Sequence, residues 1–150
     1  MIYQVELFSD IQEEIKPILK LHYDEVEQDK EAVPMDVDYD QFRNLETANL
    51  LNVCTARIDN VLVGYIITMI SKHLHHKGTL FGLVDMYYII KEHRKGFAGI
   101  NLLKFHEVQM RKLGVIKVMT MVKIEHDHSK ILERLGYKEI EKLYSKVLEV

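Results

Sequence analysis

The chain has 150 residues, 47% of them hydrophobic, so it is long and apolar enough for one domain with a buried core over residues 1–150. Its formal net charge of −3 leaves no basic excess to neutralise phosphates, which argues against a general nucleic-acid-binding protein. The lone cysteine, Cys54, excludes an internal disulfide, and its apolar neighbours are typical of a buried side chain.

The first residues give no sign of export. They carry acids where a signal peptide carries positive charge. The longest mainly apolar stretch, "VLVGYIITMI", has 10 residues, against the roughly 20 that span a bilayer. We therefore expect a cytoplasmic protein without a membrane segment.

Two helices are predicted in the first third of the chain. Apolar residues recur at helical spacing in "SDIQEEIKPILKLHYDEV", where we expect Ser9 to be the N-cap and Pro17 to bend the helix. Residues 24–40 hold eight carboxylates against one lysine, and this acidic segment reads as a loop. The pattern of "YDQFRNLETANLL" then predicts a short second helix.

The middle of the chain changes to a strand pattern. Alternating and β-branched residues predict strands in "LNVCTARI" and "VLVGYIITMIS", joined by a turn at Asp59 and Asn60. A loop, "KHLHHKG", is expected to lead to a third long strand, "TLFGLVDMYYII".

The last third alternates helix and strand. A helix after the turn "RKGFAG" is expected to end near Leu113 with Gly114 as its C-cap, and the strand "VIKVMTMVK" follows. "DHSKILERLG" reads as a helix closed by Gly136, and "YKEIEKLYSKVLEV" as one or two final strands. The predicted order, α-α-β-β-β-α-β-α-β-β, indicates an α/β (α+β) fold with a mixed sheet and flanking helices.

The turn "KEHRKGFAG" is the clearest ligand-binding candidate. Gly96 and Gly99 let backbone approach a ligand, and the first amides of the helix that follows have no partner inside that helix. Together these features suggest an anion cradle. The Rossmann pattern G-x-G-x-x-G and the P-loop Gly-Lys-Ser/Thr are absent, and the strand before the turn disfavours the KH type of RNA-binding domain.

With the strand end "MYYII" before this turn and a later helix ending in "ERLGYKEIE", the chain resembles the GNAT family of acyl-CoA-dependent N-acetyltransferases. The resemblance covers most of the chain and is most specific over residues 83–148. It implies a central mixed, mostly antiparallel sheet, acetyl-CoA as cosubstrate, and a CoA pyrophosphate as the anion at the turn.

The resemblance assigns individual residues to the CoA site. His93 takes the first place of the family's Gln/Arg-x-x-Gly-x-Gly/Ala turn, where it departs from Gln or Arg, while Gly96 and Ala98 match the later places. The preceding strand is expected to pair with pantetheine through its backbone, with the Tyr88 amide near the thioester oxygen. The implied cofactor-binding residues are Met86, Tyr87, Tyr88, His93, Arg94, Lys95, Gly96, Phe97, Ala98 and Gly99.

Acetyl transfer to an amine needs a group that accepts the ammonium proton. Asp85 stands three residues before Tyr88, where the family often has an acidic residue, and is our candidate base. The alternative for Asp85 is a strand aspartate that is held by backbone amides or by a nearby lysine.

The acid that would protonate the leaving thiolate is less clear. Leu132 stands where the family frequently has a tyrosine, and Glu125 where it often has an asparagine. Tyr137, Tyr144 and Ser129 are candidate replacements, and protonation by water is another route. The alternative for each tyrosine is that its ring packs against the protein while its hydroxyl stays at the surface.

Two further expectations concern the acceptor and metals. The acidic segment 24–40 borders the acceptor site in the family, which favours a cationic primary amine, while a solvated charge run explains it equally well. By the same resemblance His22 and Tyr23 help to shape the acceptor pocket. The histidines of "HLHH" (73–76) and "EHDH" (125–128) would form a metal site only if the two segments met, and we expect solvated histidines and no metal, with a role at the acceptor site for some of them as the further alternative.

The leading hypothesis is an enzyme that transfers acetyl from acetyl-CoA to a small-molecule or protein amine by direct attack in a ternary complex. The alternative is a catalytically silent module of the same fold that binds CoA or a protein partner, which the departures at Leu132 and Glu125 favour. Nucleic-acid binding through "HRKG" is a third and disfavoured hypothesis. Final strands often pair between subunits in the family, so a homodimer is a further expectation.

Overall fold

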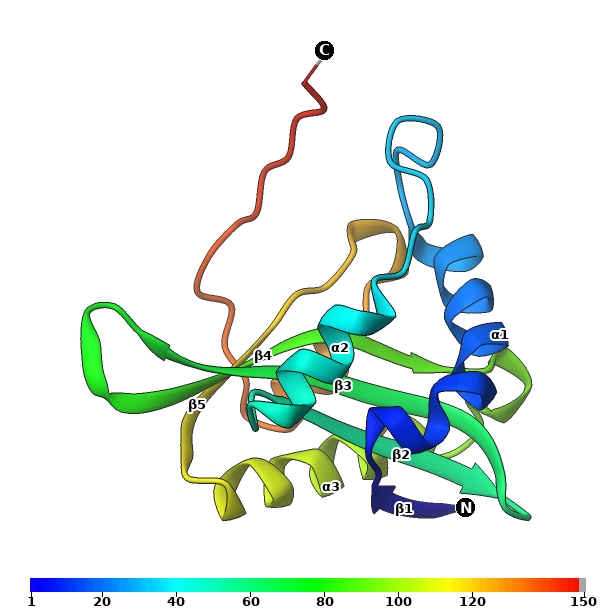
Figure 1. Ribbon diagram of the computed structural model, residues 1–150, viewed down its shortest axis with the longest axis horizontal. Coiled ribbons are helices and arrows are strands. Elements are labelled where there is room, and N and C mark those ends of the chain that lie inside the picture. Colours follow the sequence, from blue (N-terminus) through cyan, green and yellow to red (C-terminus); the bar gives the residue numbers. More distant parts are fainter. Residues whose placement is uncertain (149–150) are drawn as a thin grey trace.

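A computed structural model describes residues 1–148 and shows a five-stranded mixed sheet between two helical layers (Figure 1). The strands lie in the order β1-β2-β3-β4-β5, and every neighbouring pair is antiparallel except β4 and β5, which are parallel. Their bounds are β1 Ile2–Val5, β2 Leu51–Ile58, β3 Val61–His73, β4 His76–Ile89 and β5 Val115–Thr120.

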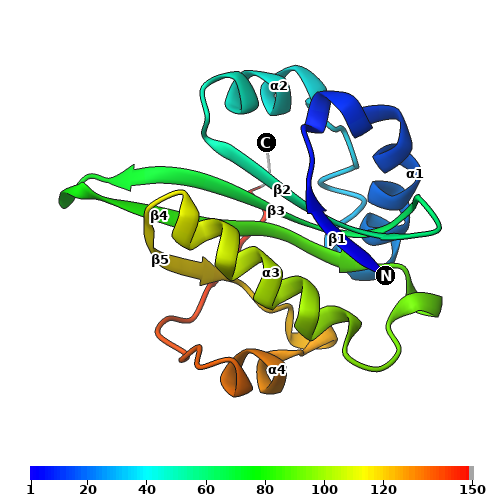
Figure 2. The same ribbon diagram turned by 90° about the horizontal axis from the view of Figure 1, so that it is seen from below.

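The helices divide between the two faces of the sheet, α1 and α2 on one and α3 and α4 on the other (Figure 2). Each face has its own core, one built around α1 and the other around α3 and α4. Cys54 is fully buried in the second core, as predicted. The bounds are α1 Phe8–Val26, α2 Tyr39–Thr47, α3 Ala98–Lys112 and α4 Ser129–Arg134, with 3-10 turns at Lys91–His93 and Ile124–His126.

The start of α1 differs from the prediction. Ser9 is not the N-cap, because the helix already begins at Phe8 and makes no side-chain cap of its own. The Glu46 carboxylate of α2 accepts hydrogen bonds from the backbone amides of Phe8 and Ser9 instead. A partner distant in the chain therefore satisfies the free amides of this helix start. The helix continues through Pro17 and ends at Val26, inside the segment that we predicted as an acidic loop.

The sheet begins with a strand that the sequence analysis missed. β1 has only four residues and pairs antiparallel with β2. Its residues are half-buried or exposed, so they carry little of the alternation that identifies a strand. The predicted order, which began with a helix, is therefore wrong at its start.

Both hairpins of the sheet have two-residue turns. Asp59 and Asn60 join β2 to β3 with φ values of 49° and 66°, as a type I′ turn requires, which confirms the predicted turn. The predicted loop at residues 72–78 is wrong, because β3 runs to His73 and β4 resumes at His76. The resulting hairpin extends beyond the rest of the sheet (Figure 1).

The predicted final strands do not form. Residues 137–148 contain no strand and run away from the body of the molecule (Figure 1), while Glu149 and Val150 lie outside the described residues. The apolar side chains of this segment are spaced irregularly, without the period of two that a half-buried strand needs. They are mostly solvent-exposed: Ile140, Leu143, Tyr144, Val147 and Leu148.

Candidate functional site

Near Asp85, strand β4 separates from β5 while it stays paired with β3. Across β3, Thr68 pairs with Val84 and Ile67 with Met86, so Asp85 is the extra residue of a β-bulge. On the other side, the parallel pairing of β4 with β5 ends where Val84 meets Thr120. Beyond this point the edge of β4 that faced β5 has no strand partner among residues 1–148. This opening offers backbone groups to an extended ligand.

The register of β4 decides which amides face the opening. Ile90 donates a backbone hydrogen bond to the Val63 carbonyl at 2.8 Å, and the direction of backbone groups alternates along an antiparallel strand. The amide of Tyr88 therefore points toward β3, whereas the amides of Tyr87 and Ile89 point into the opening. We expected the Tyr88 amide to lie near the thioester oxygen. The register of β4 instead directs the Tyr87 amide into the opening.

The turn after β4 ends in free backbone amides. Gly96 has a φ of 64°, in the left-handed region that glycine adopts most readily, and an added Cβ there would meet no atom within 4 Å. Within residues 1–148, no acceptor is found for the backbone amides of Gly96, Phe97, Gly99 and Ile100. These amides surround the N-terminus of α3, where the helix dipole favours an anion.

The two glycines of the turn do different things. Gly96 provides the backbone conformation, whereas Gly99 provides space: a Cβ at residue 99 would collide with the hydroxyl oxygen of Tyr87. The side chain of Tyr87 thus lies directly beneath the first turn of α3. One residue of β4 contributes both an amide at the opening and the ring that supports the turn.

Arg94 points into the protein rather than toward the free amides. Its guanidinium makes a two-pronged ion pair with the Glu25 carboxylate, at 2.6 and 2.7 Å, and its Nε donates to the Ile89 carbonyl at 2.7 Å. The guanidinium also lies 5.0 Å from the centre of the Tyr88 ring, whose hydroxyl donates to Glu25 at 2.9 Å. We predicted Arg94 as a cofactor ligand, but the structure uses it to tie the turn to α1.

Glu25 is a site residue that the sequence analysis did not single out. Hydrogen bonds from Arg94 and then Tyr88 lower its pKa to about 2, so it is ionised at neutral pH. The partners lie 63 and 69 residues away in the chain, and no local motif signals such a pairing. Only the docking of α1 against the end of β4 brings them together.

His22, which the resemblance placed at the acceptor pocket, lies beside this group. Its ring stacks on Tyr88 with centroids 4.6 Å apart, and its Nδ1 is 2.8 Å from the Tyr65 hydroxyl. Burial lowers the pKa of His22 to about 4, so the ring is neutral at neutral pH.

Asp85 sits at the bulge, accessible to solvent. Partial desolvation by the surrounding protein, and then the negative charge of Glu27, raise its pKa above the usual range of an aspartate. Within the described residues its side chain makes no hydrogen bond or ion pair, so the alternative of an aspartate held by amides or a lysine finds no support there. Glu27 is itself paired with Lys123 at 3.0 Å.

The structure does not bring Tyr137 or Tyr144 to the opening. Burial and the nearby Glu107 raise the pKa of Tyr137 to about 12, and Glu107 lies ten residues along α3 from Phe97, about 15 Å at the rise of an α-helix. Tyr144 is 86% exposed in the segment after α4. Neither tyrosine is placed to protonate a thiolate at β4, and Leu132 packs in the core at the position where the family has its tyrosine.

One of the histidines that we expected to be solvated lies against Tyr87 of β4 instead. His128 directly precedes α4, and its ring meets the ring of Tyr87 edge to face at 5.4 Å. Its Nε2 atom is buried and has no hydrogen-bond partner within the described part of the chain.

The two histidine segments do not meet. His73 and His75 lie at the tip of the β3–β4 hairpin, about nine residues, or about 30 Å, along β4 from Asp85. His126 and His128 both lie in the segment just before α4. Over residues 1–148 no group of three or more side chains is arranged to hold a metal ion.

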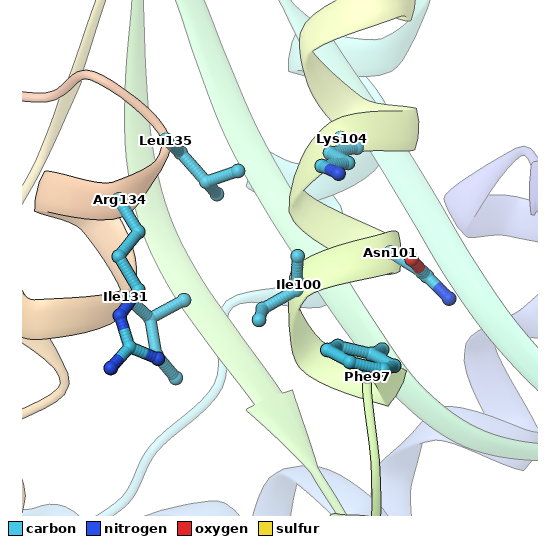
Figure 3. A pocket seen from close by; sticks show the side chains of 7 residues that line it. All are labelled: Phe97, Ile100, Asn101, Lys104, Ile131, Arg134 and Leu135. Carbon is cyan, nitrogen blue, oxygen red and sulfur yellow. The ribbon is translucent and has the colours of Figure 1, made fainter.

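A cleft of about 420 Å³ runs from the turn between α3 and α4 (Figure 3). In Figure 3 the side chains of α3 and those of α4 face each other across it, while Asn101 turns away. It combines apolar walls with two cations, Lys104 and Arg134, and it starts at Phe97, beside the free amides. Its lining residues are Phe97, Ile100, Asn101, Lys104, Ile131, Arg134 and Leu135.

A second cleft, of about 340 Å³, lies on the α1 face at the end of β4. Three carboxylates and one lysine make its charge mainly negative. Its lining residues are Leu21, Asp24, Glu25, Tyr88, Ile90, Lys91 and Glu92.

None of the helices in the described structure is both long and apolar enough to cross a membrane.

The sequence matches no protein-family model and no curated protein. Solved structures do match over nearly the whole chain. An aminoglycoside acetyltransferase, meta-AAC0020, from an uncultured soil metagenomic sample, in complex with sisomicin, is 11% identical with a TM-score of 0.75, covering 99% of this chain and 96% of its own.

Two further structures agree. The ribosomal-protein-alanine N-acetyltransferase from Brucella melitensis biovar Abortus 2308 is 18% identical with a TM-score of 0.68, covering 100% of both chains. A predicted acetyltransferase with acetyl-CoA from Clostridium acetobutylicum is 14% identical with a TM-score of 0.70, covering 97% of this chain and 94% of its own. At such identities the likeness concerns the fold, and this chain has the fold of the GNAT acetyltransferases.

Proposed function

We propose that the protein is an acetyl-CoA-dependent N-acetyltransferase that acts on a primary amine. The observation that carries this proposal is the continuity of two features: the free amides at the start of α3 and the open edge of β4. A ligand with a diphosphate at one end and an amide-rich arm at the other fits both at once. Structural neighbours in complex with acetyl-CoA or CoA support the choice of ligand.

The proposal assigns each part of acetyl-CoA to a surface. The pyrophosphate binds the amides of Gly96, Phe97, Gly99 and Ile100, because unpaired N–H groups and the helix dipole both favour an anion there. The pantetheine arm extends along the β4 edge and pairs with the amides of Tyr87 and Ile89. The adenosine end occupies the cleft between α3 and α4, whose two cations suit its phosphate.

The chemistry follows from the residues around the bulge. Asp85, directly or through a water, accepts the proton of the substrate ammonium, and the free amine attacks the thioester carbonyl. The Tyr87 amide donates to the oxygen on which negative charge develops. When the tetrahedral intermediate collapses, the C–S bond breaks, the nitrogen gives up its second proton, and water carries that proton to the departing thiolate, so that a neutral amide and the CoA thiol result.

The acceptor that fits the charge distribution is a cation. Asp85 and Glu27 lie near each other, and the cleft beside Tyr88 is lined by Asp24, Glu25 and Glu92. This negative surface would attract a protonated amine before it loses its proton. Structural neighbours are named for acceptors as different as aminoglycosides and a ribosomal-protein alanine, so the class of amine stays open.

A silent module of the same fold remains the second candidate. It rests on Leu132 and Glu125, which replace the tyrosine and asparagine expected from the family. The release of free thiol from acetyl-CoA in the presence of an amine panel separates the two candidates, since only the enzyme consumes the thioester.

The decisive experiment is calorimetry with acetyl-CoA on the wild type and two glutamate variants. Gly96→Glu places a carboxylate among the free amides and should weaken binding at least about tenfold, by like-charge repulsion and loss of the anion site. Gly114→Glu is the matched control, because Gly114 has a φ of 76°, no atom within 4 Å of an added Cβ, and lies at the far end of α3.

The expected result is tight binding by the wild type and by Gly114→Glu, and its loss in a folded Gly96→Glu. If the folded wild type does not bind acetyl-CoA, the turn is only a connection between β4 and α3, and the protein-binding module becomes the better reading. Equal losses in both variants would point to backbone strain rather than to an anion site.

A further inference from the structure

The Nε2 atom of His128 is a buried polar atom without a hydrogen-bond partner among residues 1–148. Leaving a buried polar atom unpaired is costly, so native structures rarely keep one without a reason. The ring of His128 packs edge to face against the ring of Tyr87, a residue of the part of β4 that borders the opening. Tyr87 in turn presents its amide to that opening.

The surroundings of His128 fix which of its nitrogens carries the proton. Nδ1 lies 3.2 Å from the carbonyl oxygen of His126, and because a carbonyl can only accept, Nδ1 is the protonated donor. Nε2 of the neutral ring is therefore a hydrogen-bond acceptor. Asp127 accepts from the Ser129 amide at 2.8 Å and so holds the backbone around the histidine.

The partner of Nε2 must therefore be a donor that enters the opening from outside. No metal cluster is found in the described chain, and the Tyr87 hydroxyl points toward Gly99. Resting on the proposed function, the geometry points to an amide N–H of the pantetheine arm as this donor. His128 holds the arm from the α4 side while the Tyr87 backbone holds it from the β4 side.

This role compensates for a missing residue. In the family an asparagine often bonds CoA at the place of Glu125, which here is exposed and cannot offer an amide. His128 supplies a neutral acceptor three residues later, on the same stretch before α4. It is thus a positioning residue for the cosubstrate, which touches the arm and leaves proton transfer to other groups.

Two probes separate the arm from the rest of the cosubstrate. CoA carries the pantetheine arm, whereas adenosine 3′,5′-bisphosphate has only the adenosine and phosphate groups. In wild-type protein with 15N-labelled histidines, CoA should shift the Nε2 resonance of His128 and keep the proton on Nδ1. Adenosine 3′,5′-bisphosphate should bind and leave that resonance in place.

Affinities of a variant supply the second readout. His128→Phe keeps a ring against Tyr87 but removes the acceptor, and it should weaken CoA about five- to tenfold, the worth of one hydrogen bond, without changing the affinity for the bisphosphate. His128→Gln offers an amide oxygen and should restore part of the loss.

The outcomes distinguish this inference from the function on which it rests. CoA that binds tightly without moving the Nε2 resonance overturns the role of His128 and leaves the transferase proposal standing. Equal losses of CoA and bisphosphate affinity in His128→Phe also overturn it. No binding of CoA to the folded wild type overturns both. If His128→Phe does not fold, the resonance of the labelled wild type decides alone.

Discussion

Asp85 combines three properties that a general base needs: it is accessible, it lacks a partner within the described residues, and its pKa is raised. We predict that Asp85→Asn lowers turnover about 10²- to 10⁴-fold at neutral pH and leaves the dissociation constant of acetyl-CoA nearly unchanged. Steady-state kinetics together with calorimetry measure the two effects separately.

Asp36→Asn is the control for this prediction, since it makes the same chemical change in the segment between α1 and α2. Unchanged turnover in Asp85→Asn would remove Asp85 from the role of base. In the wild type the rate should rise with pH as Asp85 ionises, because only the carboxylate accepts a proton.

Single residues also show how far the sequence alone could go. Asp85 and Gly96 could be predicted as candidate site residues, Asp85 from the family resemblance and Gly96 from the local pattern of the turn. Glu25 and His128 were missed as site residues because their significance depends on Tyr88, Arg94 and Tyr87, which other elements contribute. Local patterns identify a ligand-binding turn, whereas partners that tertiary packing brings together need the structure.

The contact between α3 and the sheet contains a buried histidine. His106 is fully buried with its Nε2 2.8 Å from the Thr68 hydroxyl, and burial lowers its pKa to about 4. Because the unfolded chain takes up this proton at higher pH than the folded one, stability is complete above about pH 6.5 and falls as the pH drops toward 4. The cost is about 2 kcal/mol between pH 6.5 and 5.

We predict that His106→Gln, which keeps an amide for Thr68 but does not titrate, flattens this pH dependence. Urea unfolding of both proteins at pH 7 and pH 5 measures it, and the remaining slope should come largely from His22, whose pKa is lowered in the same direction. Identical slopes in variant and wild type would show that His106 does not carry the effect.

The pairing of β3 with β4 depends on a close approach at Gly64. A Cβ added there would lie 2.8 Å from the Tyr88 carbonyl oxygen and 2.7 Å from a side-chain carbon of Ile89. We predict that Gly64→Ala lowers the free energy of unfolding by about 1–3 kcal/mol, or the melting temperature by roughly 3–10 °C.

Gly78→Ala is the matched control, because Gly78 lies on β4, the strand that pairs with the β3 strand of Gly64, and an added Cβ would meet no atom within 4 Å. Its melting temperature should stay within about 2 °C of the wild type. Equal melting temperatures for both variants would show that the two strands can move apart at Gly64 without cost.

Elements were predicted where a long periodic run existed. The pattern identified α1, α3 and the strands β2 to β5 because each has enough residues to show its period. The pattern missed β1, which has only four residues. It also predicted strands in residues 137–148, where none forms because the apolar residues do not alternate regularly. The hairpin tip at Leu74 was read as a loop because polar histidines conceal the strand pattern there.

At the scale of the whole molecule, the segment 137–148 bears on whether the protein assembles with a second copy of itself. It exposes apolar side chains, and the homodimer expected from the resemblance would cover them. We propose that dimer on this basis. Because residues 139–148 add little to either core, we predict that a chain ending at Lys138 keeps its melting temperature within about 2 °C of the full chain, when both are compared at a protein concentration low enough to keep the full chain monomeric.

Light scattering coupled to size-exclusion chromatography tests the dimer on the same two proteins. A full chain of twice the monomer mass and a truncated chain of single mass would support assembly through this segment. At the low concentration where the full chain is monomeric, a truncated chain that melts more than about 5 °C lower would instead mean that the segment packs on its own domain.

Glu25 belongs to both ligand surfaces at once: it lines the acidic cleft, and it holds Arg94 of the turn. A cationic acceptor that approaches this carboxylate would therefore compete with Arg94 for it. Weakening the ion pair between Arg94 and Glu25 would in turn change the position of the turn at which the pyrophosphate would bind. Thermodynamic linkage makes such an effect reciprocal, so CoA would change the affinity for the amine by the same factor as the amine changes that for CoA. Under the proposed function, this single shared carboxylate would couple the binding of the two substrates before the chemical step.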